Sequence, residues 1–70
     1  MENLELLDVV VLNKAIPTSK LRKGEIGTIV EELDSSVFLV EFADTKGVTY
    51  AMTAINATDL IKVYYAPALA

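Results

Sequence analysis

Residues 23–30 read Lys-Gly-Glu-Ile-Gly-Thr-Ile-Val and residues 37–42 read Val-Phe-Leu-Val-Glu-Phe, and these two stretches decide the fold class. Gly24 and Gly27 stand ahead of a β-branched run, and a polar turn separates that run from the second apolar segment. Glycine adopts positive φ at little cost, and its missing side chain lets strands cross closely. The pattern therefore predicts a strongly bent antiparallel hairpin of the kind that begins a small β-barrel.

Three further strands are expected around this hairpin, at residues 6–12, 48–53 and 60–65. Residues 48–53 alternate between bulky and small side chains, and the bulky set is expected to face the interior with the hairpin phenylalanines. Glu31 and Glu32 interrupt the alternation of residues 26–33, which predicts a β-bulge or the start of a turn there. The inward-facing residues on this interpretation are Phe38, Val40, Phe42, Val48, Tyr50 and Met52.

The connections complete the expected architecture. Residues 13–25 contain Pro17, which has no backbone N–H to donate, and they read as one long loop. Residues 54–59 are too short for an α-helix and predict a single 3₁₀ turn before the last strand. The sequence thus predicts an all-β fold, a small five-stranded SH3-like barrel over residues 1–70, with residues 66–70 frayed. An OB-type barrel is the nearest rival, but it usually needs a longer chain and an additional helix.

Apolar side chains exceed what so small a core can hold. The chain has 70 residues, of which 53% are hydrophobic, and a domain near this size buries only ~60% of its unfolded surface. Residues 6–12 carry apolar side chains on both faces, and Leu39 points away from Phe38 and Val40. Tyr64 and Tyr65 are consecutive strand residues, so they face opposite ways and cannot both point inward. We therefore expect a protein partner or a second copy to cover the excess, through the first and last strands and their free edges. The candidate partner-binding residues are Leu39, Glu41, Tyr64 and Tyr65.

The residue types present argue against catalysis. The chain has no cysteine and no histidine, which removes disulfides, thiolate and imidazole metal ligands, and Cys–His or Ser–His nucleophile pairs. Glu31 and Glu32 are consecutive, so a regular strand would place them on opposite faces rather than as an acid–base pair. We expect neither enzymatic activity nor a cofactor or metal. The chain also has no apolar run of ~18 residues and begins with acidic rather than basic residues, which predicts a cytoplasmic protein without a membrane span.

Charge is distributed unevenly along the chain. The net charge of −4 opposes binding to a phosphate backbone. Residues 13–25 nevertheless carry four basic side chains against Glu25, a local charge of +3 by four minus one. The segment is either a solvated loop or an anion-binding loop. The candidate anion-binding residues are Lys14, Lys20, Arg22 and Lys23.

Two resemblances accompany these patterns. Residues 23–29 resemble the KOW motif of ribosomal and transcription-elongation proteins, in which a glycine begins the bent strand of such a barrel. Residues 6–10, 21–32, 40–42, 49–52 and 59–61 resemble, in order and spacing, a family of small bacterial proteins frequent in cyanobacteria and catalogued as domain of unknown function number four-nine-two-six. That resemblance implies the barrel fold and a bacterial origin, and it offers no catalytic residue to carry over.

Two functions from different classes follow as hypotheses. The first is a non-catalytic protein–protein interaction module, either an accessory subunit or an inhibitor-like protein acting on a basic partner. The second is a KOW-like barrel that binds nucleic acid through the basic loop of residues 14–23. Salt dependence separates the two, because phosphate contacts weaken steeply with salt and apolar contacts do not.

Overall fold

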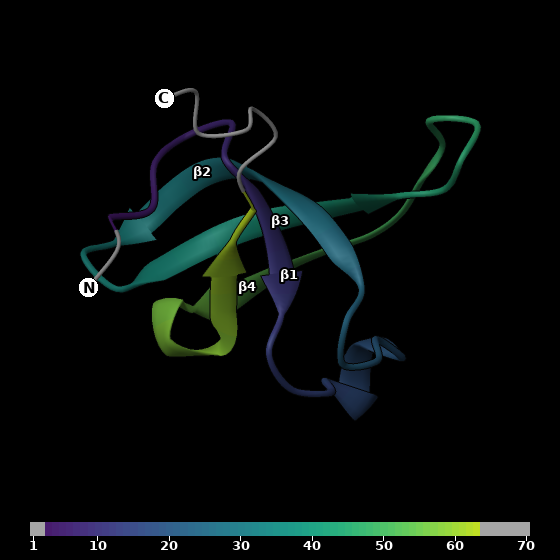
Figure 1. The fold of residues 1–70 in the computed structure, drawn as a ribbon, viewed down its shortest axis with the longest axis horizontal. Helices are drawn as coiled ribbons and strands as arrows, with labels where there is room; N and C mark the ends of the chain where they lie inside the picture. Colours follow the sequence, from purple (N-terminus) through teal and green to yellow (C-terminus); the bar gives the residue numbers. More distant parts are fainter. Residues whose placement is uncertain (1–2, 64–70) are drawn as a thin grey trace, which may run out of the picture.

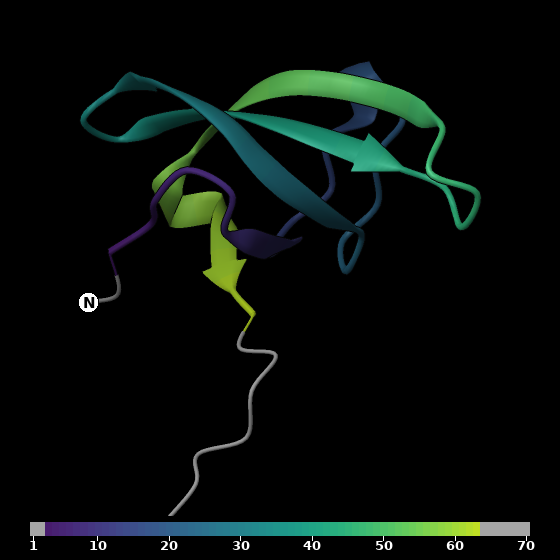
Figure 2. The same ribbon diagram turned by 90° about the horizontal axis from the view of Figure 1, so that it is seen from above.

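A computed structural model describes residues 3–63 of the chain (Figures 1 and 2). The strands are β1 (Val9–Leu12), β2 (Ile26–Asp34), β3 (Val37–Ala43), β4 (Thr49–Asn56) and β5 (Leu60–Lys62). Two 3₁₀ turns, η1 (Pro17–Ser19) and η2 (Ala57–Asp59), lie in the connections. These are the helices of the described residues, and neither is long enough to cross a membrane.

All strand pairs are antiparallel, and the sheet has the order β4-β3-β2-β1-β5. The prediction of an all-β fold with five strands is confirmed. The pairing within residues 3–63 leaves the sheet open between β4 and β5, so the closed SH3-like barrel stays a prediction. The sequence analysis expected the first strand to have a free edge. That expectation is wrong, because β1 pairs with β2 on one side and with β5 on the other.

β2 links the two parts of the sheet by bending. Its first residues pair with β1 and the rest pair with β3, and two register shifts, after Ile29 and after Glu32, interrupt the β2–β3 ladder. The predicted irregularity at Glu31 and Glu32 is therefore confirmed. Gly27 lies in this bend, where a Cβ atom would stand 2.6 Å from Val40 Cγ1 and 2.9 Å from the Glu41 carbonyl oxygen. Close strand approach requires the glycine there, whereas Gly24 has the positive φ of 95° that the preceding turn requires.

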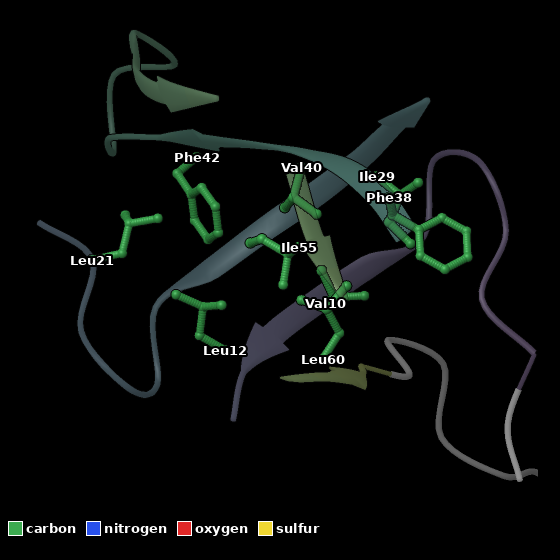
Figure 3. Packing of buried hydrophobic residues seen from close by; sticks show 9 residues of the cluster. All are labelled: Val10, Leu12, Leu21, Ile29, Phe38, Val40, Phe42, Ile55 and Leu60. Carbon is green, nitrogen blue, oxygen red and sulfur yellow. The ribbon is translucent and has the colours of Figure 1, made fainter. Parts of the chain in front are cut away.

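The core lies on one face of the sheet (Figure 3). Alternation places Val10, Leu12 and Ile29 inward, and the predicted inward set of β3 is confirmed. Leu21 joins them from the loop of residues 13–25, because a backbone bridge between Ile16 and Leu21 folds that loop back on itself. The complete buried cluster is Val10, Leu12, Leu21, Ile29, Phe38, Val40, Phe42, Ile55 and Leu60.

β4 presents the opposite face from the one predicted. Ile55 is buried and Ala51 packs against the core, whereas Tyr50 and Met52 are each about half exposed, at 53% and 51%. Ala51, Thr53 and Ile55 pair with inward residues of β3, so Met52 takes the other face, and Tyr50 lies at the register shift between Phe42 and Ala43. The prediction from side-chain bulk was wrong, because register rather than size sets the face of a strand. Val48, also predicted inward, precedes the strand and is exposed.

Several predicted element bounds also need correction. The fourth strand covers Thr49–Asn56 rather than residues 48–53. Residues 6–8 are not part of the first strand, because residues 5–8 form a turn in which the Asp8 carboxylate accepts the Glu5 amide. The loop of residues 13–25 contains a 3₁₀ turn that was not expected, where Pro17 supplies a suitable φ at the first helical position. The predicted single 3₁₀ turn before the last strand is confirmed at Ala57–Asp59, within the predicted residues 54–59. Residues 64–70, which include the end of the predicted last strand and the predicted frayed tail, lie outside the described residues.

Candidate protein-binding surface

The turn at residues 5–8 displays two leucines to solvent. Leu6 is 58% exposed and Leu7 is 75% exposed, and Leu7 has a positive φ of 71°. Backbone hydrogen bonds hold it there, from the Leu7 amide to the Ile29 carbonyl at 2.7 Å and from the Ile29 amide to the Asp8 carbonyl at 2.9 Å. A bulky residue rarely adopts this backbone conformation, so the surrounding hydrogen bonds impose it. The turn therefore fixes an apolar pair on the surface instead of burying it.

The face of the sheet opposite the core carries a second apolar group. Val11 pairs with Ile26 of β2 and with Ile61 of β5, and directly paired residues project from the same face. Ile26 and Ile61 are about half exposed, and Val11 is half-buried between them. Adjacent strands lie about 4.8 Å apart, so the three side chains form a continuous apolar surface. We call Ile61, Val11 and Ile26 the outer row.

Leu39 and Glu41, two of the predicted contact residues, lie on this outer face in β3. Leu39 pairs with Glu31 and with Ala54, and it is half-buried rather than freely exposed. The Glu41 carboxylate accepts a hydrogen bond from the Thr49 hydroxyl, and Glu41 pairs with Met52. Both residues thus share the face of the outer row but belong to the other half of the sheet. The remaining candidates, Tyr64 and Tyr65, lie outside the described residues.

The four basic candidates are all exposed on the loop between β1 and β2. Lys20 has a positive φ of 57° at the end of η1, where its amide bonds to the Pro17 carbonyl at 3.0 Å. Arg22 Nε lies 3.9 Å from Glu25 Oε2, a long contact for a guanidinium that is 90% exposed. The loop therefore presents positive charge to solvent, and Glu25 offsets part of it.

Glu25 also connects this loop to β4. Its Oε1 atom accepts the Tyr50 hydroxyl at 2.6 Å, and its Oε2 atom accepts the Arg22 amide at 2.6 Å. The Tyr50 hydrogen bond is the main reason that the pKa of the Glu25 carboxyl lies below its ordinary value, and the Arg22 amide adds to the effect. The same bond raises the pKa of Tyr50 above its ordinary value. Because the Tyr50 ring also lies 6.5 Å from that of Phe42, the arrangement anchors the loop beside the core.

A groove opens at the end of the sheet where β2 turns into β3. Its volume is about 510 Å³. Phe38 and the partly buried Leu4 and Ala57 contribute apolar surface, and the Ala57 amide bonds to the Ser36 carbonyl at 2.8 Å. Figure 3 shows Phe38 at the end of the core cluster beside the purple N-terminal segment. The residues lining the groove are Asn3, Leu4, Glu5, Glu32, Ser35, Ser36, Phe38, Ala57 and Thr58.

Sequence reasoning missed the exposed leucines, the outer row and this groove. The outward position of Ile26 could have been predicted from alternation along β2. Ile26 is next to the inward Gly27 and an odd number of positions from the inward Ile29, so it faces the other side. The leucines were assigned to a strand, although Asp8 following Glu5 by three residues is a spacing that also suits a turn. The groove had no sequence signal, since its residues come from three separate segments of the chain.

Comparison with known proteins finds one match, to a family model. A family model described as a domain of unknown function (DUF4926) matches residues 6–62, which is most of the chain. No curated protein and no solved structure matches the chain significantly.

Proposed function

This chain belongs to the DUF4926 family of domains of unknown function, and we propose that it acts as a non-catalytic protein–protein interaction module. In this proposal it is an accessory subunit or an inhibitor-like partner protein that works in the bacterial cytoplasm. The scaffold is an SH3-like barrel whose two halves are joined through the bend of β2. A protein partner binds the face of the sheet that the core leaves uncovered.

The outer row is the observation that carries the proposal. The side chains of Ile26 and Ile61 are about half exposed although the opposite face of the same strands supplies a closed core. Fully burying an isoleucine side chain contributes about 2 kcal/mol, so covering the exposed halves of both contributes about 2 kcal/mol in total. Three apolar side chains in register offer a partner a flat, rigid contact that needs no side-chain rearrangement.

The test is capture of a partner with matched surface variants. The double variant Ile26→Thr with Ile61→Thr removes apolar surface from the outer row while retaining β-branched side chains. Val48→Thr is the control, because Val48 is 60% exposed and lies at the β3–β4 connection. Each tagged chain is incubated with native cell extract, and captured proteins are identified by mass spectrometry. We expect a protein that the wild type and the control capture and the double variant does not.

Light scattering over a concentration series tests self-association of the wild type, the double variant and the control. A mass that rises with concentration in the wild type and the control, but not in the double variant, identifies a second copy as the partner. Equal capture and equal mass for all three chains, each shown by circular dichroism to be folded, would contradict the assignment of the outer row.

Nucleic-acid binding is the second candidate, favoured by the exposure of all four basic side chains on one loop. The net charge of −4 opposes it over the molecule as a whole, so we expect only weak, salt-sensitive association with RNA. Fluorescence anisotropy with mixed-sequence RNA at physiological salt measures this. Submicromolar binding that is abolished by neutralising Lys20, Arg22 and Lys23 would reverse the order of the two candidates.

A further inference from the structure

We propose that the groove between residues 3–5 and the β2–β3 turn receives an arginine or lysine side chain from an extended segment of the protein partner. This inference rests on the proposed function, because it takes the occupant to be part of a protein. It goes further by assigning a second contact site, separate from the outer row, and the chemistry of the segment that fills it.

The charges around the groove point to a cation. Glu5 and Glu32 are both exposed and both line it, and none of the described lining residues carries a positive charge. Within residues 3–63, Arg22 and Lys62 form ion pairs with Glu25 and Asp8 instead, so neither groove carboxylate has a cationic partner there. Glu31 and Asp34 on the same end of β2 add to the negative potential. A negative, partly enclosed site favours a positive ligand over a phosphate.

The interior of the groove fits the rest of such a side chain. Leu4, Phe38 and Ala57 supply apolar surface, and lysine and arginine bury their aliphatic stems while their charged ends stay near solvent. Ser35, Ser36 and Thr58 are exposed hydroxyl-bearing residues that also line the groove and can accept hydrogen bonds from the cation.

The neighbouring turn explains why the occupant is an extended segment rather than a free cation. Leu6 and Leu7 follow Glu5 directly and are held outward by the hydrogen bonds of residues 5–8. Apolar residues two positions before or after the basic residue project from the same side of an extended segment and would contact these leucines. The groove and the leucine turn together therefore favour a segment in which a basic residue stands between apolar ones.

The experiment uses the full chain labelled with ¹⁵N and a capped pentapeptide probe, acetyl-Leu-Ala-Arg-Ala-Leu-amide, in which both leucines share the face of the arginine when the peptide is extended. The matched control peptide carries citrulline in place of arginine, which keeps the shape and removes the charge. We expect the arginine probe to shift the backbone amide signals of Glu5, Glu32, Ser35 and Thr58 in a saturable way. The citrulline peptide, and the arginine probe on the double variant Glu5→Gln with Glu32→Gln, should bind about tenfold more weakly, as expected for losing two ion pairs.

A variant elsewhere in the chain controls for the general loss of a carboxylate. Asp44→Asn removes one carboxylate in the β3–β4 connection, which is not part of the groove, and should leave the probe affinity unchanged. Equal shifts with the arginine and citrulline peptides, or shifts that persist in the double groove variant, would overturn the inference. Capture through the outer row is measured separately, so a failure of the peptide test with intact capture rejects the groove assignment and leaves the proposed function standing.

Discussion

Gly27 is the residue at which the geometry of the sheet depends most directly on one side chain being absent. A Cβ atom there would lie 2.6 Å from Val40 Cγ1 and 2.9 Å from both the Glu41 carbonyl oxygen and Phe42 Cε1. Val40 and Phe42 are fully buried, and the carbonyl belongs to the paired strand, so none of the three has room to withdraw. The bend of β2 therefore excludes every other residue type at this position.

Replacing Gly27 by alanine should lower the free energy of unfolding by about 1–3 kcal/mol, the cost of overpacking a closed core. Urea denaturation measures the midpoint and the slope. Thr28→Val on the same strand, at a half-buried position facing the other way, is the control and should change stability little. An unchanged midpoint and slope for Gly27→Ala would show that β3 does not approach β2 as closely as described.

The hydrogen bond between Tyr50 and Glu25 gives a pH-dependent prediction. Folding lowers the pKa of Glu25, so the ionised carboxylate stabilises the folded state above its unfolded pKa, and this contribution is lost as pH falls through the folded pKa. Tyr50→Phe removes the main cause and should raise the Glu25 pKa toward its ordinary value. The stability difference between the two chains should shrink over the same acidic range.

Carboxyl NMR titration of the wild type and Tyr50→Phe measures this change in the Glu25 pKa. A Glu25 titration that is identical in both chains would mean that the hydroxyl contact at 2.6 Å is not formed in solution.

The sequence predicts the role of a residue well where the backbone conformation requires one residue type. It predicts burial poorly where strand pairing and packing determine which side chains face the core. The two glycines were assigned correctly, because positive φ at Gly24 and close approach at Gly27 are both properties that only glycine supplies cheaply. Tyr50 was assigned to the core, and it lies half exposed. The β3–β4 pairing places Ala51 rather than Tyr50 opposite the inward Phe42, and residue type does not reveal that pairing.

At the scale of elements, the turn at residues 5–8 combines strain with exposure. A left-handed conformation costs an ordinary residue about 1–2 kcal/mol, whereas asparagine tolerates it better. Leu7 has a φ of 71° and only a quarter of its surface is covered, with 75% exposed. Core packing therefore does not account for leucine at this position.

Leu7→Asn should leave stability unchanged or raise it by up to about 1 kcal/mol, because it relieves strain and removes little burial. Thermal and urea denaturation measure the effect. Leu6→Asn is the matched control, since Leu6 is also exposed but does not have positive φ, and it should show no gain. A loss of more than about 1 kcal/mol in Leu7→Asn alone would show that the leucine side chain supports the fold.

Element boundaries followed from the sequence only where turn chemistry was explicit. Gly47 lies in the β3–β4 connection with a φ of 82°, and the sequence predicts the preceding strand at residues 37–43, as the structure shows. The start of β1 was placed too early, since Leu6 and Leu7 have strand-like composition but the Asp8 carboxylate forms a local hydrogen bond instead. A pattern of apolar residues does not reveal that a side-chain hydrogen bond competes locally with strand pairing.

For the whole molecule, composition predicts that some apolar surface stays uncovered. Only the strand pairing in the structure shows where that surface lies. The outer row unites residues 11, 26 and 61, and sequence patterns alone do not say that β1 lies between β2 and β5. The groove likewise joins residues 3–5, 32–38 and 57–58. Both candidate sites are thus products of topology.

Binding of the captured partner should weaken only moderately as salt increases. The outer row contributes apolar contacts that salt does not screen, whereas the exposed groove carboxylates act over about 10 Å at 0.1 M salt and are screened above it. Surface plasmon resonance over a salt series should show a falling association rate and a nearly constant dissociation rate. The groove variant Glu5→Gln with Glu32→Gln should flatten the dependence of the association rate on salt. A steep loss of affinity that this variant does not change would place the charged contact elsewhere, with the loop of residues 13–25 as the first candidate.

If the outer row binds a partner as proposed, the pairing of β1 with β5 also determines when during synthesis on the ribosome the chain becomes able to bind. Val11 and Ile26 emerge early, but Ile61 completes the outer row, and Leu60 beside it completes the core. A nascent or truncated chain that stops before residue 60 has neither. Under the proposed function, partner recognition through the outer row therefore requires the last strand, and a chain ending at residue 58 should fail to capture the partner even when it is produced in quantity.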